Sequence, residues 1–189
     1  MPSVAYDLGY FQAGVRVLKE YILSSEIYWP AGAKPPAGEP SYPQLTLGGL
    51  LLARARLRAR RLPTDRDVEL TRLEREFDRL CSRWRVSWQA KAEREFHARL
   101  VLWRDFLEEY RAHPGNHVDR YAYEVSRRVM LALLTPEAPG VPPEEIELLG
   151  ALDQLLETIL VRGEFIWDAE IKLGFPPETY WYLYGLPRG

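Results

Sequence analysis

Residues 65–111 have the sequence DRDVELTRLEREFDRLCSRWRVSWQAKAEREFHARLVLWRDFLEEYR. Apolar and aromatic side chains recur in it every three or four residues, which is the spacing of one face of an α-helix. The stretch predicts one very long amphipathic helix, or two helices stacked end to end. We call this face the apolar stripe; it consists of Leu70, Leu73, Phe77, Leu80, Trp84, Trp88, Ala92, Phe96, Leu100, Trp103, Leu107 and Tyr110.

The spacing within the apolar stripe favours a nearly straight helix. Its 11 steps cover 40 residues, about 3.64 residues per step, which is closer to a straight helix than to the 3.5-residue repeat of a left-handed coiled coil. A continuous helix over 65–111 would be on the order of 70 Å long, more than the width of one small domain. We therefore expect either a partner that covers an overhanging end or a break, most readily at residues 82–87, where Val86 and two serines lower the helix propensity.

The rest of the chain predicts shorter helices that cover this stripe. Apolar periodicity indicates helices at about 5–24, 47–61, 117–134 and 143–161. The helix at 143–161 is apolar on most of its circumference, so we expect it to be central. Thr46 is a suitable N-cap for the second helix, and Thr64 or Asp65 for the long one.

Two segments of unusual composition complete the expected fold. Residues 29–44 are rich in proline, which cannot continue a helix, and predict a long loop. Residues 163–189 are dense in aromatic side chains and are expected to pack on the bundle. The predicted fold class is all-α: a bundle of five to six helices around a very long central helix at about 65–111, in a single domain over residues 1–189.

Composition excludes several classes of protein. The 189 residues are 47% hydrophobic and 28% charged, which suits a globular protein with a sizeable core. No stretch approaches the roughly 20 apolar residues of a membrane span, and no signal peptide is visible at the start. The single cysteine, Cys81, excludes an internal disulfide. We expect a cytoplasmic protein that does not bind membranes.

Charge is unevenly spread along the chain. Residues 1–62 carry 8 basic and 4 acidic side chains, residues 63–112 carry 11 of each, and residues 113–189 carry 6 basic and 12 acidic. This polarity can cancel inside the fold or between subunits. The net charge of −2 argues against a general polyanion binder. Arginine outnumbers lysine 21 to 4, which is compatible with a thermophilic source and equally with a high-GC genome.

The strongest local charge signal is the run of alternating arginines between Arg54 and Arg61. On a helix, Arg54, Arg58 and Arg61 share one face, and guanidinium groups bind phosphate oxygens well. This face is the candidate site for nucleic acid or another polyanion. The alternative is a solvated face, or one paired with acids elsewhere.

Other candidate sites lie in the aromatic C-terminal part. Glu164 and Asp168 are the only candidates we identify for acid–base catalysis, since burial among aromatic rings would raise a carboxyl pKa. A ligand pocket or partner anchor could use the aromatic residues Trp167, Tyr180, Trp181 and Tyr184; the alternative is a lid packed on the core. We expect no metal site and no cofactor, because neither a multi-helix carboxylate–histidine motif nor a phosphate-binding loop is present.

These observations favour a non-enzymatic cytoplasmic interaction or scaffold protein, self-associating as a homodimer through the long helix or binding another protein. The first alternative is a nucleic-acid-associated protein that uses the Arg54–Arg61 face. The second is a small-ligand binder or enzyme with its pocket under the aromatic segment. An exposed apolar stripe would favour the first function, unpaired arginines the second, and a cavity containing carboxylates the third.

Overall fold

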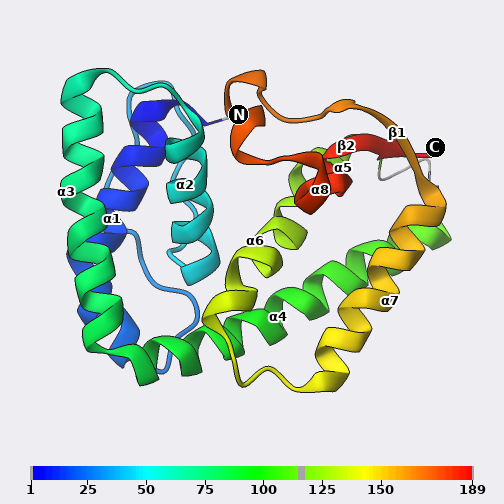
Figure 1. The fold of residues 1–189 in the computed structure, drawn as a ribbon, viewed down its shortest axis with the longest axis horizontal. Helices are drawn as coiled ribbons and strands as arrows, with labels where there is room; N and C mark the ends of the chain where they lie inside the picture. The colour runs from blue at the N-terminus through cyan, green and yellow to red at the C-terminus, as the bar shows by residue number, and fades with distance from the viewer. Residues whose placement is uncertain (1, 115–117, 189) are drawn as a thin grey trace.

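The computed structural model describes residues 2–114 and 118–188 and is mostly helical, which confirms the all-α class (Figure 1). The helical elements, with η for 3-10 helices, are α1 (Val4–Leu23), α2 (Leu47–Ala59), α3 (Thr64–Arg83), α4 (Arg85–Ala112), α5 (Val118–Glu124), α6 (Ser126–Leu134), η2 (Thr135–Glu137), α7 (Pro143–Ile159), η3 (Ala169–Gly174), α8 (Pro177–Tyr180) and η4 (Trp181–Leu183). None of the described helices is both long and apolar enough to cross a membrane.

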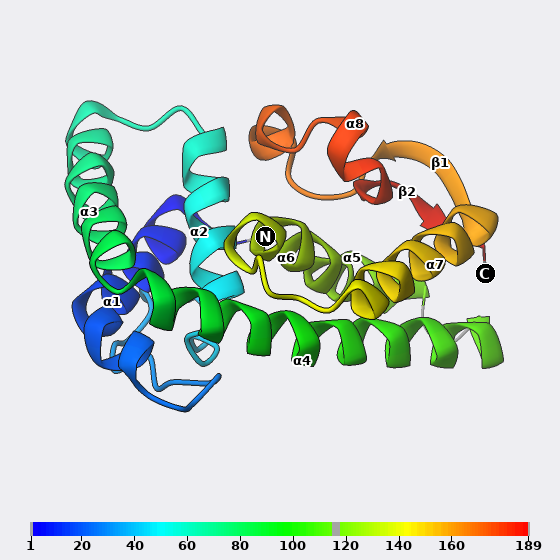
Figure 2. The same ribbon diagram turned by 60° about the horizontal axis from the view of Figure 1, so that its bottom comes forward.

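The expected long helix is divided in two at Trp84. This residue leaves the helical conformation (φ −113°, ψ 35°), and the chain turns sharply between α3 and α4 (Figures 1 and 2). Hydrogen bonds continue on either side, from the Trp84 N–H to the Leu80 carbonyl and from the Trp88 N–H to the Trp84 carbonyl. The nearly straight rod was therefore wrong, whereas the break expected at residues 82–87 is confirmed.

Division of the helix lets both halves of the apolar stripe find partners in the same chain. The α3 half packs against α1, and the α4 half runs beneath α2, α6 and α7 (Figure 2). Every member of the stripe except Trp84 is buried. The stripe is consequently not available to a second copy, so self-association would have to use another surface.

The other elements follow the predicted pattern with three corrections. Thr46 caps α2 as expected, accepting a hydrogen bond from the Gly49 N–H, but α3 is preceded by Pro63 and has no side-chain cap. The helix expected at 117–134 is two helices, α5 and α6, separated at Val125. Helix α7 lies at one end of the molecule and not at its centre (Figure 1), and it buries only Leu149, Leu152 and Leu156.

The C-terminal part contains a strand pair that the sequence did not predict. Strands β1 (Leu160–Phe165) and β2 (Tyr184–Pro187) form an antiparallel two-stranded sheet, with Val161 opposite Leu186. Between the strands, η3 packs on α2 and α8 packs on η4, and the Tyr121 hydroxyl of α5 donates a hydrogen bond to the Tyr182 carbonyl oxygen of η4. Helix α8 begins at Pro177, where proline suits the first turn of a helix.

The proline-rich segment is a strap laid along α1. The Tyr42 ring packs edge-on against Tyr6, with ring centroids 4.8 Å apart, and Trp29 packs against Tyr21 at 6.0 Å. A backbone bridge between Trp29 and Leu45 closes the segment just before α2. The expected loop is therefore confirmed, and its aromatic residues hold it on the helices.

The start of α2 is held by a buried carboxylate from α4. Glu95, 1% exposed, accepts hydrogen bonds from the backbone N–H groups of Leu47 and Gly48, at 2.6 and 3.0 Å. The side chain of Arg99 bridges Glu95 to Thr46. A Cβ at Gly48 would lie only 2.8 Å from a Glu95 oxygen, so glycine permits this close approach. A negative charge here also complements the helix dipole.

We predict that Glu95→Ala lowers the free energy of unfolding by about 3 kcal/mol or more, because it leaves two buried N–H groups and a guanidinium without their acceptor. Urea denaturation measures the change. The control is Glu108→Ala on the same helix, whose exposed carboxylate lies 3.8 Å from Arg104 and should matter by less than about 0.5 kcal/mol. Equal effects of the two substitutions would contradict the role given to Glu95.

The end of α1 is held by a buried lysine. The Lys91 ammonium donates hydrogen bonds to the carbonyl oxygens of Ser24 and Glu26 and to the Ser24 hydroxyl, and it lies 4.3 Å from the centre of the Tyr21 ring. A positive charge at this position complements the carboxyl end of a helix. Burial lowers the pKa of Lys91 to about 8.

This pKa predicts a pH dependence of stability with a definite sign. The folded chain releases the Lys91 proton near pH 8, whereas the unfolded chain keeps it to about pH 10.4. Between these values the unfolded state binds more protons, so the Lys91 contribution to the free energy of unfolding rises with pH. The stability of the parent relative to Lys91→Met should therefore increase from pH 7 to 10, by at most about 1.4 kcal/mol per pH unit.

Urea denaturation across this pH range measures the difference. Lys19→Met on the exposed side of α1 is the matched control for loss of a lysine charge. A difference between the parent and Lys91→Met that stays constant or shrinks with rising pH would show that Lys91 keeps its proton in the fold.

Candidate anion-binding cleft

The arginines predicted to bind polyanions are largely paired inside the chain. Arg54 binds Glu74 and Asp78 of α3, at 3.0 and 2.8 Å, and its guanidinium lies over the Phe77 ring. Arg58 also binds Glu74. Arg61, just beyond α2, is exposed. The structure thus gives two of the three predicted residues an acidic partner on a neighbouring helix, and their binding of a polyanion remains a prediction.

The remaining arginines of this run are also neutralised. Arg56 and Arg60 both donate to the buried carboxylate of Asp7 on α1, each at 2.8 Å. Arg60 additionally donates to the Pro2 carbonyl oxygen. The charged face of α2 is therefore mainly a structural connection to α1 and α3.

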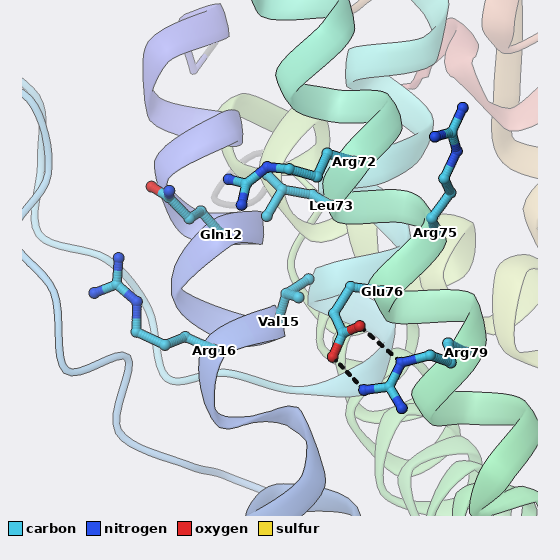
Figure 3. Close-up of a pocket in the computed structure, with 8 residues that line it drawn as sticks. All are labelled: Gln12, Val15, Arg16, Arg72, Leu73, Arg75, Glu76 and Arg79. Atoms are coloured by element: carbon cyan, nitrogen blue, oxygen red, sulfur yellow. Dashed lines mark hydrogen bonds and ion pairs between the residues drawn. The ribbon is translucent and has the colours of Figure 1, made fainter.

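A different set of arginines lines a cleft on the outer side of α1 and α3. The cleft has a volume of about 590 Å³, within the range of small-ligand sites. Buried Val15 and Leu73 lie between the two helices (Figure 3). The polar lining comes from both helices and consists of Gln12, Arg16, Arg72, Arg75, Glu76 and Arg79.

The cleft carries an excess of positive charge, with four arginines and one glutamate in its lining. Arg79 forms two hydrogen bonds with Glu76, at 2.6 and 2.8 Å, which lower the pKa of that carboxyl. Arg16, Arg72 and Arg75 are exposed. Within residues 2–114 and 118–188, none of these three is in an ion pair.

The side-chain directions leave the three unpaired arginines open to a ligand. Arg72 extends from α3 over Leu73 toward Gln12 of α1, while Arg16 and Arg75 point outward on the two sides (Figure 3). The Glu76–Arg79 pair is at one end of the cleft. An anion seated over Leu73 would therefore meet the Arg72 guanidinium directly, whereas Arg16 and Arg75 border the cleft on its two sides.

Sequence reasoning missed this cleft because acids and bases alternate along α3. Residues 63–112 are neutral when counted as a whole, so they gave no charge signal. The acids Glu74 and Asp78 face α2, where they bind Arg54, and this leaves Arg72 and Arg75 without them. A helical projection of α3 places Glu74 and Asp78 on a different face from Arg72 and Arg75. Only the position of α2 shows that the acidic face is the one already paired.

The aromatic C-terminal residues pack mainly on the protein itself. The Trp167 indole N–H donates to the Ala122 carbonyl oxygen, and the Tyr184 hydroxyl donates to the Phe175 carbonyl oxygen. The rings of Tyr180 and Trp181 each lie edge-on to Tyr182. These contacts are those of a lid on the core, and the cleft between α1 and α3 is formed without them.

Among the described residues, neither candidate catalytic carboxylate, Glu164 or Asp168, is paired with another ionisable side chain. Glu164 is exposed on β1. Asp168 caps η3 by accepting a hydrogen bond from the Glu170 N–H. Burial raises the pKa of the Cys81 thiol to about 12, which leaves it protonated and unreactive at neutral pH.

Histidine and carboxylate side chains of α4 link it to α7 and to the loop that precedes α7. His97 Nδ1 lies 2.6 Å from Glu145 Oε1, and Glu93 accepts a hydrogen bond from the Gly140 N–H. Among the described residues, no group of three or more His, Cys, Asp or Glu side chains is arranged to hold a metal ion.

Comparison with known proteins adds no further assignment to this geometry. No family model matches the chain, and neither a curated protein nor a solved structure shows significant similarity to it.

Proposed function

We propose that this chain is a non-enzymatic interaction protein that binds the phosphate backbone of nucleic acid through the cleft between α1 and α3. The observation that carries the proposal is the group of three exposed arginines, Arg16, Arg72 and Arg75, without acidic partners among the described residues. Guanidinium groups form paired hydrogen bonds with phosphate oxygens. A nucleic-acid strand that crosses the cleft could therefore contact Arg72 over Leu73 and Arg16 or Arg75 at the two sides.

The spacing of the arginines suits a chain of phosphates. Arg72, Arg75 and Arg79 follow one another along α3 at three and four residues, so they are about 4.5 and 6 Å apart along the helix axis. Arg16 adds a guanidinium from the facing helix. A strand that lies along the cleft can therefore meet several arginines in succession.

The residues that line the cleft also determine which features of a nucleic acid it can recognise. Among the described residues that line the cleft, Gln12 is the only uncharged polar side chain, and none is aromatic and able to stack on a base. Phosphate contacts position a nucleic acid without reading its sequence. The net charge of −2 also opposes approach of a polyanion. We therefore propose binding that is independent of sequence and sensitive to salt.

The test is fluorescence anisotropy with a labelled single-stranded oligonucleotide at increasing salt. Neutralising about three phosphates predicts a slope of roughly −2 for log K against log salt concentration. The variant Arg16→Ala, Arg72→Ala, Arg75→Ala should lose at least about tenfold in affinity at low salt and most of this slope.

The matched control removes three exposed arginines outside both the cleft and the Arg54–Arg61 face: Arg111→Ala, Arg162→Ala, Arg188→Ala. It changes the net charge equally but should retain most of the affinity and of the salt slope. Absence of binding by the parent at low salt, or equal losses in both triple variants, would reject the cleft as a nucleic-acid site.

A further inference from the structure

The acidic counterpart of the cleft is the outer face of α7. This helix contains five acidic side chains and no basic one. Two of the five are paired within the chain, Glu145 with His97 and Asp153 with Arg128. The three others are exposed and make no ion pair with any residue in 2–114 or 118–188: Glu144, Glu147 and Glu157.

The outer face of α7 has a shape that permits close approach of another helix pair. Its centre is formed by Gly150 and Ala151, both exposed, and a Cβ added at Gly150 would have no atom within 4 Å. Glu144 and Glu147 lie one turn apart at one end of this flat region, and Glu157 lies near the other end. Carboxylates therefore flank a surface that has small residues at its centre and also carries the exposed side chain of Gln154.

The cleft and α7 cannot meet within one molecule. In both ribbon views α3 lies at one end of the molecule and α7 at the other (Figures 1 and 2). Contacts with α4, including the His97–Glu145 pair, keep α7 in its place. The outer face of α7 can therefore reach a cleft only when the two belong to different copies of the chain.

We infer that the arginine cleft of one molecule binds the outer face of α7 of another. Three unpaired guanidinium groups would meet three unpaired carboxylates, and the small residues at the centre of α7 would face the rim of the cleft. The inference rests on the proposed anion-binding role of the cleft and names a partner for it.

The association is head-to-tail. Each molecule offers one cleft and one α7, so a bound pair still has one of each free, and a third molecule can add. Exposed ion pairs and a small contact area give weak binding, with a Kd on the order of 10–100 µM at low salt. A polyanion in the cleft excludes α7, so nucleic acid would disperse the assembly.

The experiment is sedimentation equilibrium at low salt and high protein concentration with two variants. One loses the cleft charges (Arg16→Gln, Arg72→Gln, Arg75→Gln), and the other loses the α7 charges (Glu144→Gln, Glu147→Gln, Glu157→Gln). The parent should form a concentration-dependent series of oligomers that high salt dissociates. Each variant alone should keep the 21.9 kDa monomer mass.

An equimolar mixture of the two variants should form a species of twice the monomer mass and nothing larger. Only one functional cleft and one functional α7 face remain in each pair, so growth stops. A parent that stays monomeric, or a mixture that stays monomeric, would overturn the inference. A symmetric dimer of the parent that both variants retain would overturn it as well.

The two proposals can fail separately. The α7 variant keeps the cleft, so it should bind the labelled oligonucleotide at least as tightly as the parent. Loss of oligonucleotide binding with retained dimers in the mixture would reject only the nucleic-acid proposal. Oligonucleotide binding without dimers in the mixture would reject only the head-to-tail association.

Discussion

Burial of the apolar stripe is the constraint on which the rest of the structure depends. A straight helix over residues 65–111 would be on the order of 70 Å long, and the remaining helices are too short to cover it. The turn at Trp84 solves this, because α3 folds against α1 while α4 carries α6 and α7. The cleft follows directly, since it lies on the outer edge of the α1–α3 contact.

Buried charges then connect the helices that the stripe brings together. Glu95 of α4 binds the start of α2, and Lys91 of the same helix binds the end of α1. Asp7 of α1 joins two arginines from the end of α2. Each of these groups is enclosed and has partners, because a buried charge without them would cost several kcal/mol. Such pairs set the positions of helix ends more narrowly than apolar contacts alone.

Two sets of surface charges lie at opposite ends of the molecule. Among the described residues, Arg16, Arg72 and Arg75 at the α1–α3 end have no acidic partner, and Glu144, Glu147 and Glu157 on α7 at the other end have no basic one (Figure 1). This separation links the two proposals, because a phosphate backbone and the α7 face of another copy would use the same guanidinium groups. Both interactions are weakened by salt, so competition between them would be strongest at low ionic strength.

The sequence by itself determined the helical class and the approximate place of most helices, because periodicity, prolines and the Thr46 cap act over a few neighbouring residues. Tertiary structure decided the features that depend on distant residues. The β1–β2 pair joins segments about twenty residues apart, and no local sequence pattern predicts such pairing. The cleft likewise depends on α2, whose Arg54 binds Glu74 and Asp78. Which arginines remain unpaired is set by the helices that face them, and not by their order in the chain.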